Sequence, residues 1–152
     1  MADQNVGRLA RCLRMLGFDT LFFDGQDDGE MVRLALDEGR VILTRDTHIV
    51  ERKIVTSGRL KAVLLVSDRP EEQLYQVTKS LGLKDSFRPF TLCIEDNHPL
   101  EERSKEAVRN RVPPYVFKTQ QRYTECPHCN RIYWRGTHWQ MMSLKLEKLT
   151  AC

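Results

Sequence analysis

Apolar residues near the start of the chain are spaced for one face of a helix. They are Val6, Leu9, Ala10, Leu13 and Leu16, and arginines stand between them. This pattern predicts a helix over residues 6–16. It should end at Gly17, because glycine commonly follows the last turn of a helix. Residues 20–24 then predict a short buried strand, and residues 30–38 predict a second helix.

Strand and helix patterns continue to alternate up to about residue 82. Residues 40–46 and 61–66 predict two more buried strands, and each is followed by a helical pattern, over residues 47–57 and from Pro70 to Gly82. Proline suits the first turn of a helix. Strands that alternate with helices pair in parallel through right-handed crossovers, so the first part of the chain is predicted to have an α/β fold.

The pattern changes between residues 86 and 90, where we place a domain boundary. Residues 88–94 predict a strand that leads into a turn, and a charged, helix-prone segment follows. The sequence Val112-Pro-Pro-Tyr115 should then break any helix. The tail from residue 125 to residue 152 holds a cysteine pair, an aromatic patch and a final amphipathic helix. The predicted domains are residues 1–88 and 89–152.

Composition and charge restrict the classes of function. The chain is 41% hydrophobic and 30% charged, as in a globular protein. It has no secretory signal pattern and no apolar run near the roughly 18–20 residues of a membrane span, which favours an intracellular protein, cytoplasmic or nuclear. Its net charge is only +3, but acids gather early and basic residues late. This suits a metal site beside a phosphate-binding surface, and two solvated faces are the alternative.

Acidic residues stand at or just beyond several predicted strand ends. They are Asp3, Asp24, Asp28, Glu30, Asp46 and Asp68. The carboxyl ends of parallel strands open into one crevice, where converging carboxylates favour Mg²⁺ or Mn²⁺. Such ions can activate water and stabilise the leaving oxygen of a phosphodiester. Capping of the next helix is the alternative for Asp28 and Asp68, and a turn is the alternative for Asp24. Asp46 ends the clearest buried strand.

The pair Cys126-Pro-His-Cys129 has the spacing of a zinc knuckle, in which both thiolates face one ion. A redox pair is the alternative, but no thioredoxin-like context surrounds it. The chain has 5 cysteines, an odd number, and no secretory features, so disulfides are not expected. Cys12 and Cys152 are poor candidates for metal ligands.

A set of motifs spans essentially the whole chain. It comprises Asp3, Gly7-Arg-Leu-Ala-Arg11, Leu16-Gly-Phe-Asp-Thr20, Asp28, Glu38-Gly-Arg-Val-Ile-Leu-Thr-Arg-Asp46, Glu72-Gln-Leu74 and Ile132-Tyr-Trp-Arg-Gly-Thr-His-Trp139. The combination resembles the Mut-seven C-terminal RNase domain family, PIN-like nucleases usually followed by a zinc ribbon. The resemblance implies a metal-dependent ribonuclease in which Asp3, Asp28 and Asp46 bind the metal, with Glu30 and Asp68 as supporting candidates. It also implies a PIN-like parallel sheet flanked by helices and a zinc-ribbon-like, RNA-binding second domain.

The chain departs from this family at its start. The family has an apolar strand before the residue that matches Asp3, whereas here only Met1 and Ala2 precede it. We therefore expect the first strand to be missing and Asp3 to have no rigid element to hold it. The chain is then either a fragment or a catalytically impaired copy. Animal members form the C-terminus of larger exonucleases resembling mut-7, which fits the first case. In the second case the chain would be an RNA-binding or protein-docking module of such an exonuclease.

The resemblance places the second half of the zinc site at Cys93 and Asp96, where the family has a second cysteine. Zinc would then be held by Cys93, Cys126 and Cys129, with Asp96 or His98 as the fourth ligand. The alternative is a tail without zinc that is held by apolar packing.

Basic and aromatic residues are interleaved in the tail. Such residues neutralise phosphates and stack on unpaired bases, and we select Arg131, Arg135 and His138 as candidates for RNA contact. For Trp134 and Trp139 we favour the alternative that they are core residues of a small ribbon. A nucleotide-binding α/β domain is disfavoured because the sequence has no glycine-rich phosphate loop.

Overall fold

The structure is a computed structural model, and it describes residues 1–150. Cys152, set aside above as a metal ligand, lies outside the described residues. The chain forms two compact units. The first comprises Met1–Leu13 and Thr20–Asp85, and the second comprises Arg14–Asp19 and Ser86–Cys152. In the described part of the chain, no helix is long and apolar enough to span a lipid bilayer.

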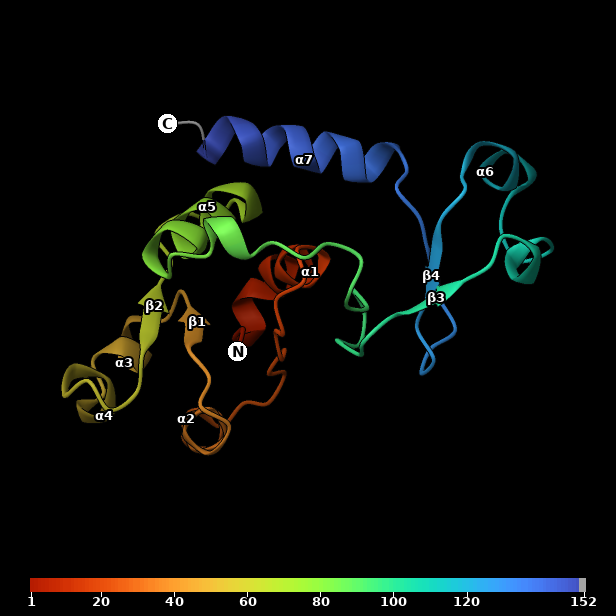
Figure 1. Ribbon diagram of the computed structural model, residues 1–152. Coiled ribbons are helices and arrows are strands. Elements are labelled where there is room, and N and C mark those ends of the chain that lie inside the picture. The colour runs from red at the N-terminus through yellow and green to blue at the C-terminus, as the bar shows by residue number, and fades with distance from the viewer. Residues whose placement is uncertain (151–152) are drawn as a thin grey trace. The chain divides into compact units, whose positions relative to one another are not determined.

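The first unit alternates helices and strands, as the sequence predicts. After the short 3-10 helix Gln4–Val6 come α1 (Gly7–Met15), α2 (Asp28–Asp37), β1 (Ile42–Thr44), α3 (Thr47–Val50), α4 (Lys53–Thr56), β2 (Ala62–Leu64) and α5 (Pro70–Ser80). Strands β1 and β2 pair in parallel, with Ile42 opposite Ala62 and Thr44 opposite Leu64 (Figure 1). The helix predicted over residues 47–57 is divided into α3 and α4, and the strand predicted over residues 20–24 is reduced to a single bridge at Phe22.

The first three residues pair with chain segments on both sides. Ala2 forms parallel bridges with Phe22 and with Leu43. The amide of Ala2 donates to the Leu21 carbonyl at 2.8 Å, and the amide of Asp3 donates to the Leu43 carbonyl at 3.0 Å. The expectation that Asp3 has no rigid element to hold it is therefore wrong. Pairing on both sides fixes this short segment in place of a longer strand.

Apolar side chains from these elements form the core of the first unit. Its fully or almost fully buried members include Met1, Met31, Ala35, Ile42 and Ile49. The helices bury the faces that their periodicity predicts, and the side chain of Met1 anchors the first segment in this core. Burial of Met1 adds an apolar contact to the backbone pairing that holds Asp3.

The second unit is built on a three-stranded antiparallel sheet. Its elements are β3 (Glu101–Arg103), a 3-10 helix (Glu106–Val108), α6 (Pro114–Thr119), β4 (Tyr123–Glu125), β5 (Ile132–Tyr133) and α7 (Thr137–Thr150). The strand order is β3-β4-β5, and Figure 1 labels β3 and β4. The final helix was predicted correctly. Val108, Val112 and Tyr123 form a small core with Ile132 and Trp134 packed against it.

Two predictions for the second unit are wrong, and a third feature has an added role. Residues 88–94 form no strand; Leu92 makes only a single bridge with Pro99. The charged segment begins with strand β3 rather than a helix, because its backbone pairs with β4. No helix runs through Val112-Pro-Pro-Tyr115, as predicted, and Pro114 also occupies the first turn of α6, where its missing amide hydrogen has no cost.

The segment Arg14–Asp19 belongs to the second unit although its first two residues are the last two of α1. The Arg14 guanidinium donates to the carbonyls of Ile94 and Glu95 at 2.9 and 3.0 Å. Gly17 has a φ of 90°, and a Cβ at this position would lie 2.1 Å from the Arg88 carbonyl oxygen. Glycine is therefore needed here both to end α1 and to admit the neighbouring backbone.

Candidate functional site

Thr44 connects two of the predicted acidic residues in the first unit. Its hydroxyl donates to Oδ2 of Asp3 at 2.7 Å and accepts the amide hydrogen of Asp46 at 3.0 Å. Thr44 is fully buried, and Asp3 is 6% exposed. Asp3 and Asp46 each follow a segment of the parallel pairing, which is why both reach the same edge. Sequence reasoning missed Thr44, although it stands within the motif Thr44-Arg-Asp46.

Both carboxylates also stabilise the start of a helix. Oδ1 of Asp3 accepts the amide hydrogen of Gln4 at 2.7 Å, and Oδ1 of Asp46 accepts that of His48 at 2.9 Å. These bonds fix the orientation of each carboxylate relative to the backbone. Asp3 and Asp46 are therefore helix caps as well as candidate metal ligands, whereas the sequence suggested capping for Asp28 and Asp68.

The other acidic candidates are arranged differently. Asp28 is the first residue of α2, and its Oδ2 lies 3.7 Å from the Arg52 guanidinium. Asp27, rather than Asp28, caps this helix. Glu30 and Asp68 are exposed. Among the described residues, both groups of three or more Cys, His, Asp or Glu ligand atoms lying within 4.8 Å of one another are in the second unit. Asp3, Asp28 and Asp46 do not form such a group.

Four predicted zinc ligands come together in the second unit. Ligand atoms of Cys93, Asp96, Cys126 and Cys129 all lie within 4.8 Å of one another. The Sγ atoms of Cys93 and Cys129 are 3.6 Å apart, and Sγ of Cys126 is 3.4 Å from each oxygen of Asp96. We call these four residues the cysteine–aspartate group.

The first half of this group is a tight turn that begins at Cys93. The amide of Cys93 donates to the His98 carbonyl at 2.8 Å, and the amide of Asn97 donates to the Cys93 carbonyl at 3.0 Å. Asn97 has a φ of 65°, a left-handed conformation that asparagine tolerates better than most residues. Asp96 stands immediately before it.

The second half repeats this backbone arrangement. The amide of Cys126 donates to the Arg131 carbonyl at 2.9 Å, and the amide of Asn130 donates to the Cys126 carbonyl at 2.8 Å. Asn130 has a φ of 61°. Cys129 precedes it, as Asp96 precedes Asn97 in the first turn. Asp96 therefore occupies the position in its turn that corresponds to Cys129.

The protonation of the group depends on burial and hydrogen bonding. Burial raises the pKa of the Cys126 thiol, and burial together with the sulfur of Cys93 raises the pKa of Cys129 to about 12. Burial also acts to raise the pKa of Asp96. Hydrogen bonds from the His98 amide and from the His128, Cys93 and Cys126 side chains outweigh this effect, so that the pKa falls well below its ordinary value. A soft cation would displace the thiol protons and neutralise the resulting thiolates.

Two histidines and a tyrosine surround the group. Nδ1 of His128 lies 2.9 Å from Oδ2 of Asp96, and Nδ1 of His98 lies 3.4 Å from its Oδ1. The two imidazole rings are stacked, with centroids 4.4 Å apart. The Tyr133 hydroxyl is 3.1 Å from Sγ of Cys93. His98 was a candidate ligand, whereas sequence reasoning gave no role to His128, which lies between the two cysteines of the knuckle.

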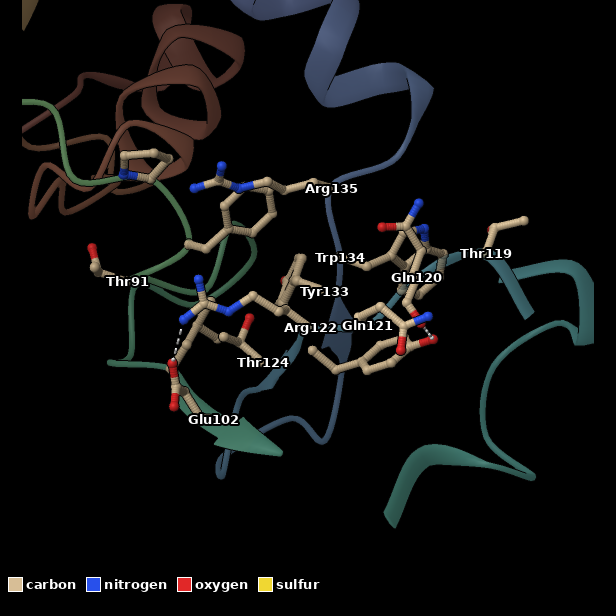
Figure 2. Close-up of a pocket in the computed structure, with 14 residues that line it drawn as sticks. Thr91, Glu102, Thr119, Gln120, Gln121, Arg122, Thr124, Tyr133, Trp134 and Arg135 are labelled. Atoms are coloured by element: carbon tan, nitrogen blue, oxygen red, sulfur yellow. Dashed lines mark hydrogen bonds and ion pairs between the residues drawn. The ribbon is translucent and has the colours of Figure 1, made fainter. Parts of the chain in front are cut away.

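The predicted RNA-contact residues occupy separate parts of the second unit. Arg135 lies over the Phe90 ring, at 5.4 Å from its centroid, and lines a cavity of about 600 Å³ (Figure 2). His138 lines a second cavity of about 290 Å³. Arg131 is exposed on the knuckle, where its Nη1 lies 4.0 Å from a Glu95 oxygen.

The chain was compared with known families, curated proteins and solved structures. The family model described as Mut7-C RNAse domain matches residues 1–146, which is almost the whole chain. No curated protein and no solved structure matches it.

Proposed function

The chain belongs to the Mut7-C RNAse domain family, and on this premise we propose that it is a PIN-like, metal-dependent ribonuclease that hydrolyses RNA phosphodiester bonds. The observation that carries the proposal is the hydrogen-bonded connection from Asp3 through Thr44 to Asp46. This connection joins two carboxylates that stand on paired backbone at one edge of the parallel pairing. Ligands of parallel sheets bind at such an edge.

Asp3 and Asp46 would hold a Mg²⁺ or Mn²⁺ ion, which when bound would neutralise phosphate charge and activate water. Their oxygen ligands suit these hard cations. Thr44 fixes the buried carboxylate of Asp3 by donating to its Oδ2, and the Gln4 amide fixes its Oδ1. These two bonds keep the carboxylate oriented before a cation arrives.

Asp28 would join the site by giving up its contact with Arg52. The 3.7 Å separation between the two side chains, both about two-fifths exposed, marks a weak ion pair. Such pairs contribute little to stability, so exchanging the guanidinium for a divalent cation is inexpensive. Arg52 would then be available to contact a phosphate of the substrate.

We propose in addition that the cysteine–aspartate group binds Zn²⁺. Three sulfurs and one carboxylate are a donor set that zinc accepts in tetrahedral sites, whereas Mg²⁺ and Mn²⁺ prefer oxygen. Asp96 takes the position of the fourth ligand, and the histidine side chains on its two oxygens would orient it. The role of this ion is structural, because it joins the two turns.

A non-catalytic RNA-binding or protein-docking module is the second candidate. It is favoured by the finding that, among the described residues, the first unit holds no three acidic ligands within 4.8 Å of one another. RNA binding by such a module would weaken with rising salt and would persist after Asp46→Asn.

Cleavage of labelled RNA in Mg²⁺ or Mn²⁺ separates the two candidates. We expect the wild-type chain to cleave, and Asp3→Asn and Asp46→Asn to lose cleavage while keeping their thermal unfolding temperature within a few degrees. Asp37→Asn is the matched control, because this exposed residue ends α2 and its substitution removes the same charge. Equal cleavage by the wild type and Asp46→Asn would refute the ribonuclease proposal.

A further inference from the structure

One face of the antiparallel sheet forms the floor of the 600 Å³ cavity. Thr124 of β4 lies opposite Glu102 of β3 and opposite Tyr133 of β5. Residues directly opposite one another project from the same face of a sheet. All three line the cavity, so this row of side chains crosses the three strands beneath it (Figure 2).

The walls of the cavity combine aromatic rings, guanidinium groups and primary amides. The wall residues that the argument uses are Phe90, Gln120, Gln121, Arg122, Trp134 and Arg135. The Arg122 side chain is 90% exposed, and its Nη2 lies 3.6 Å from the Glu102 carboxylate. Figure 2 shows this pair on the side of the floor away from Gln120 and Gln121.

Thr124 supplies an independent sign that the cavity takes a polar ligand. Among the described residues, its Oγ1 is the buried side-chain nitrogen or oxygen that has no hydrogen-bond partner. Buried polar atoms are nearly always paired, because the loss of hydration is otherwise uncompensated. Rotation about χ1 would turn this hydroxyl toward the cavity that Thr124 lines, where a hydrogen bond with a ligand would remove the penalty.

We propose that this cavity binds a nucleotide of single-stranded RNA, an inference that rests on the proposed ribonuclease function. An unpaired base would stack against the aromatic wall at Trp134, as bases do in single-strand binding proteins. The side-chain amides of Gln120 and Gln121 offer both donors and acceptors to the edge of a base. Arg122 and Arg135 would neutralise the adjoining phosphates.

The size and charge of the cavity agree with this ligand. Small-molecule sites have volumes of about 300–1,000 Å³, and the cavity measures about 600 Å³. The lining contains two guanidinium groups and one carboxylate, that of Glu102, so it carries excess positive charge. A base in a duplex cannot present its face to a side chain, and the site therefore favours single strands over duplexes.

Fluorescence anisotropy with a short labelled single-stranded RNA tests the proposal. The full chain carries Asp46→Asn throughout, so that cleavage does not remove the probe. In this background we expect Gln121→Ala and Arg122→Gln each to weaken binding about tenfold, equivalent to about 1.4 kcal/mol. Arg109→Gln removes the same charge outside the cavity lining and is expected to change binding less than twofold.

Thr124→Val separates ligand contact from structural damage. Valine keeps the shape of threonine but removes a hydroxyl that has no partner in the free protein. We expect it to weaken RNA binding while leaving the thermal unfolding temperature unchanged or higher. A purely structural role of Thr124 would instead lower the unfolding temperature together with binding, which would contradict the proposal.

The outcomes for the cavity and for the catalytic proposal can be told apart. If Gln121→Ala and Thr124→Val bind RNA as the parent does, the cavity is not an RNA site, whether or not the wild type cleaves RNA. If binding depends on these residues but the wild type cleaves nothing, the cavity proposal stands and the ribonuclease proposal fails. An unlabelled duplex of the same sequence should compete poorly, and equal competition would overturn the single-strand assignment.

Discussion

Asp96 occupies the same position in its turn that Cys129 occupies in the other. Each follows its cysteine by three residues and precedes an asparagine with positive φ, at 65° for Asn97 and 61° for Asn130. The hydrogen bonds that close the two turns also correspond. The two turns therefore share one backbone arrangement, with a carboxylate in one and a thiol in the other at the corresponding position.

Restoring the fourth thiol should strengthen zinc binding. Carboxylates are less common than thiolates as structural zinc ligands, so we expect Asp96→Cys to tighten Zn²⁺ binding by about tenfold or more, or about 1.4 kcal/mol. Asp96→Ala should weaken it by a similar factor. Competition with a chromophoric chelator measures both affinities. An affinity that is the same in all three proteins would show that Asp96 is not a ligand.

Removal of zinc should destabilise the second unit selectively. An ion present at 100 times its dissociation constant stabilises the folded form by about 2.7 kcal/mol. Both tryptophans, Trp134 and Trp139, belong to the second unit, so their fluorescence reports on it. We expect a strong chelator to lower the unfolding temperature seen by tryptophan fluorescence, and added Zn²⁺ to restore it. Cys12→Ser, in the first unit, is the control and should respond to the chelator as the wild type does.

Glu125 should contribute more to stability than the exposed acids of its unit. Its side chain is 7% exposed, accepts a hydrogen bond from Arg103 at 2.7 Å, and also contacts Arg111. The hydrogen bond from Arg111 and, against the effect of burial, that from Arg103 lower the pKa of Glu125. Because both arginines remain partly exposed, we expect Glu125→Gln to lower the free energy of unfolding by about 2 kcal/mol.

Denaturant unfolding at neutral pH with saturating zinc measures this difference. The matched control is Glu106→Gln, which breaks the exposed ion pair with Arg109. We expect this control to change the free energy of unfolding far less than Glu125→Gln does, because solvent screens the exposed pair. Equal losses in the two variants would mean that burial adds nothing to the contacts of Glu125.

The sequence predicted the elements whose signal is local. The helix ending at Gly17 and the buried strand ending at Thr44 each follow from their own periodicity. The spacing of Cys126 and Cys129 likewise brings their sulfurs into one group without reference to the rest of the chain. Residues close together in the sequence were sufficient to predict these features.

Features that depend on distant segments could not be predicted in this way. The segment Met1–Asp3 is too short to show a strand pattern. It is held in an extended conformation by pairing with chain segments on both sides. The charged residues of β3 look helix-prone in the sequence. They are extended in the structure because they pair with β4. The grouping of Arg14 with the second unit depends on carbonyl groups eighty positions further along the chain. None of these partners is visible in the local pattern.

The same limitation explains why Thr44 was missed, and it leads to a prediction about activity. Thr44→Val retains the shape of this buried side chain but removes the hydrogen bond to Asp3. Partners that orient a metal-binding carboxylate commonly change metal affinity or activity by about 10- to 100-fold when mutated. We expect a loss of RNA cleavage in this range, and Thr44→Ser, which keeps the hydroxyl, to stay within a few-fold of wild type.

Single-turnover cleavage across a Mg²⁺ titration distinguishes positioning from general damage. If Thr44 orients Asp3, the valine variant needs a higher Mg²⁺ concentration for half-maximal cleavage, and excess Mg²⁺ recovers part of the rate. Its free energy of unfolding should fall by about 1–3 kcal/mol, because the carboxylate of Asp3 stays buried without this donor. Wild-type cleavage by Thr44→Val, in an enzyme that Asp46→Asn inactivates, would show that the hydroxyl plays no part in holding the site.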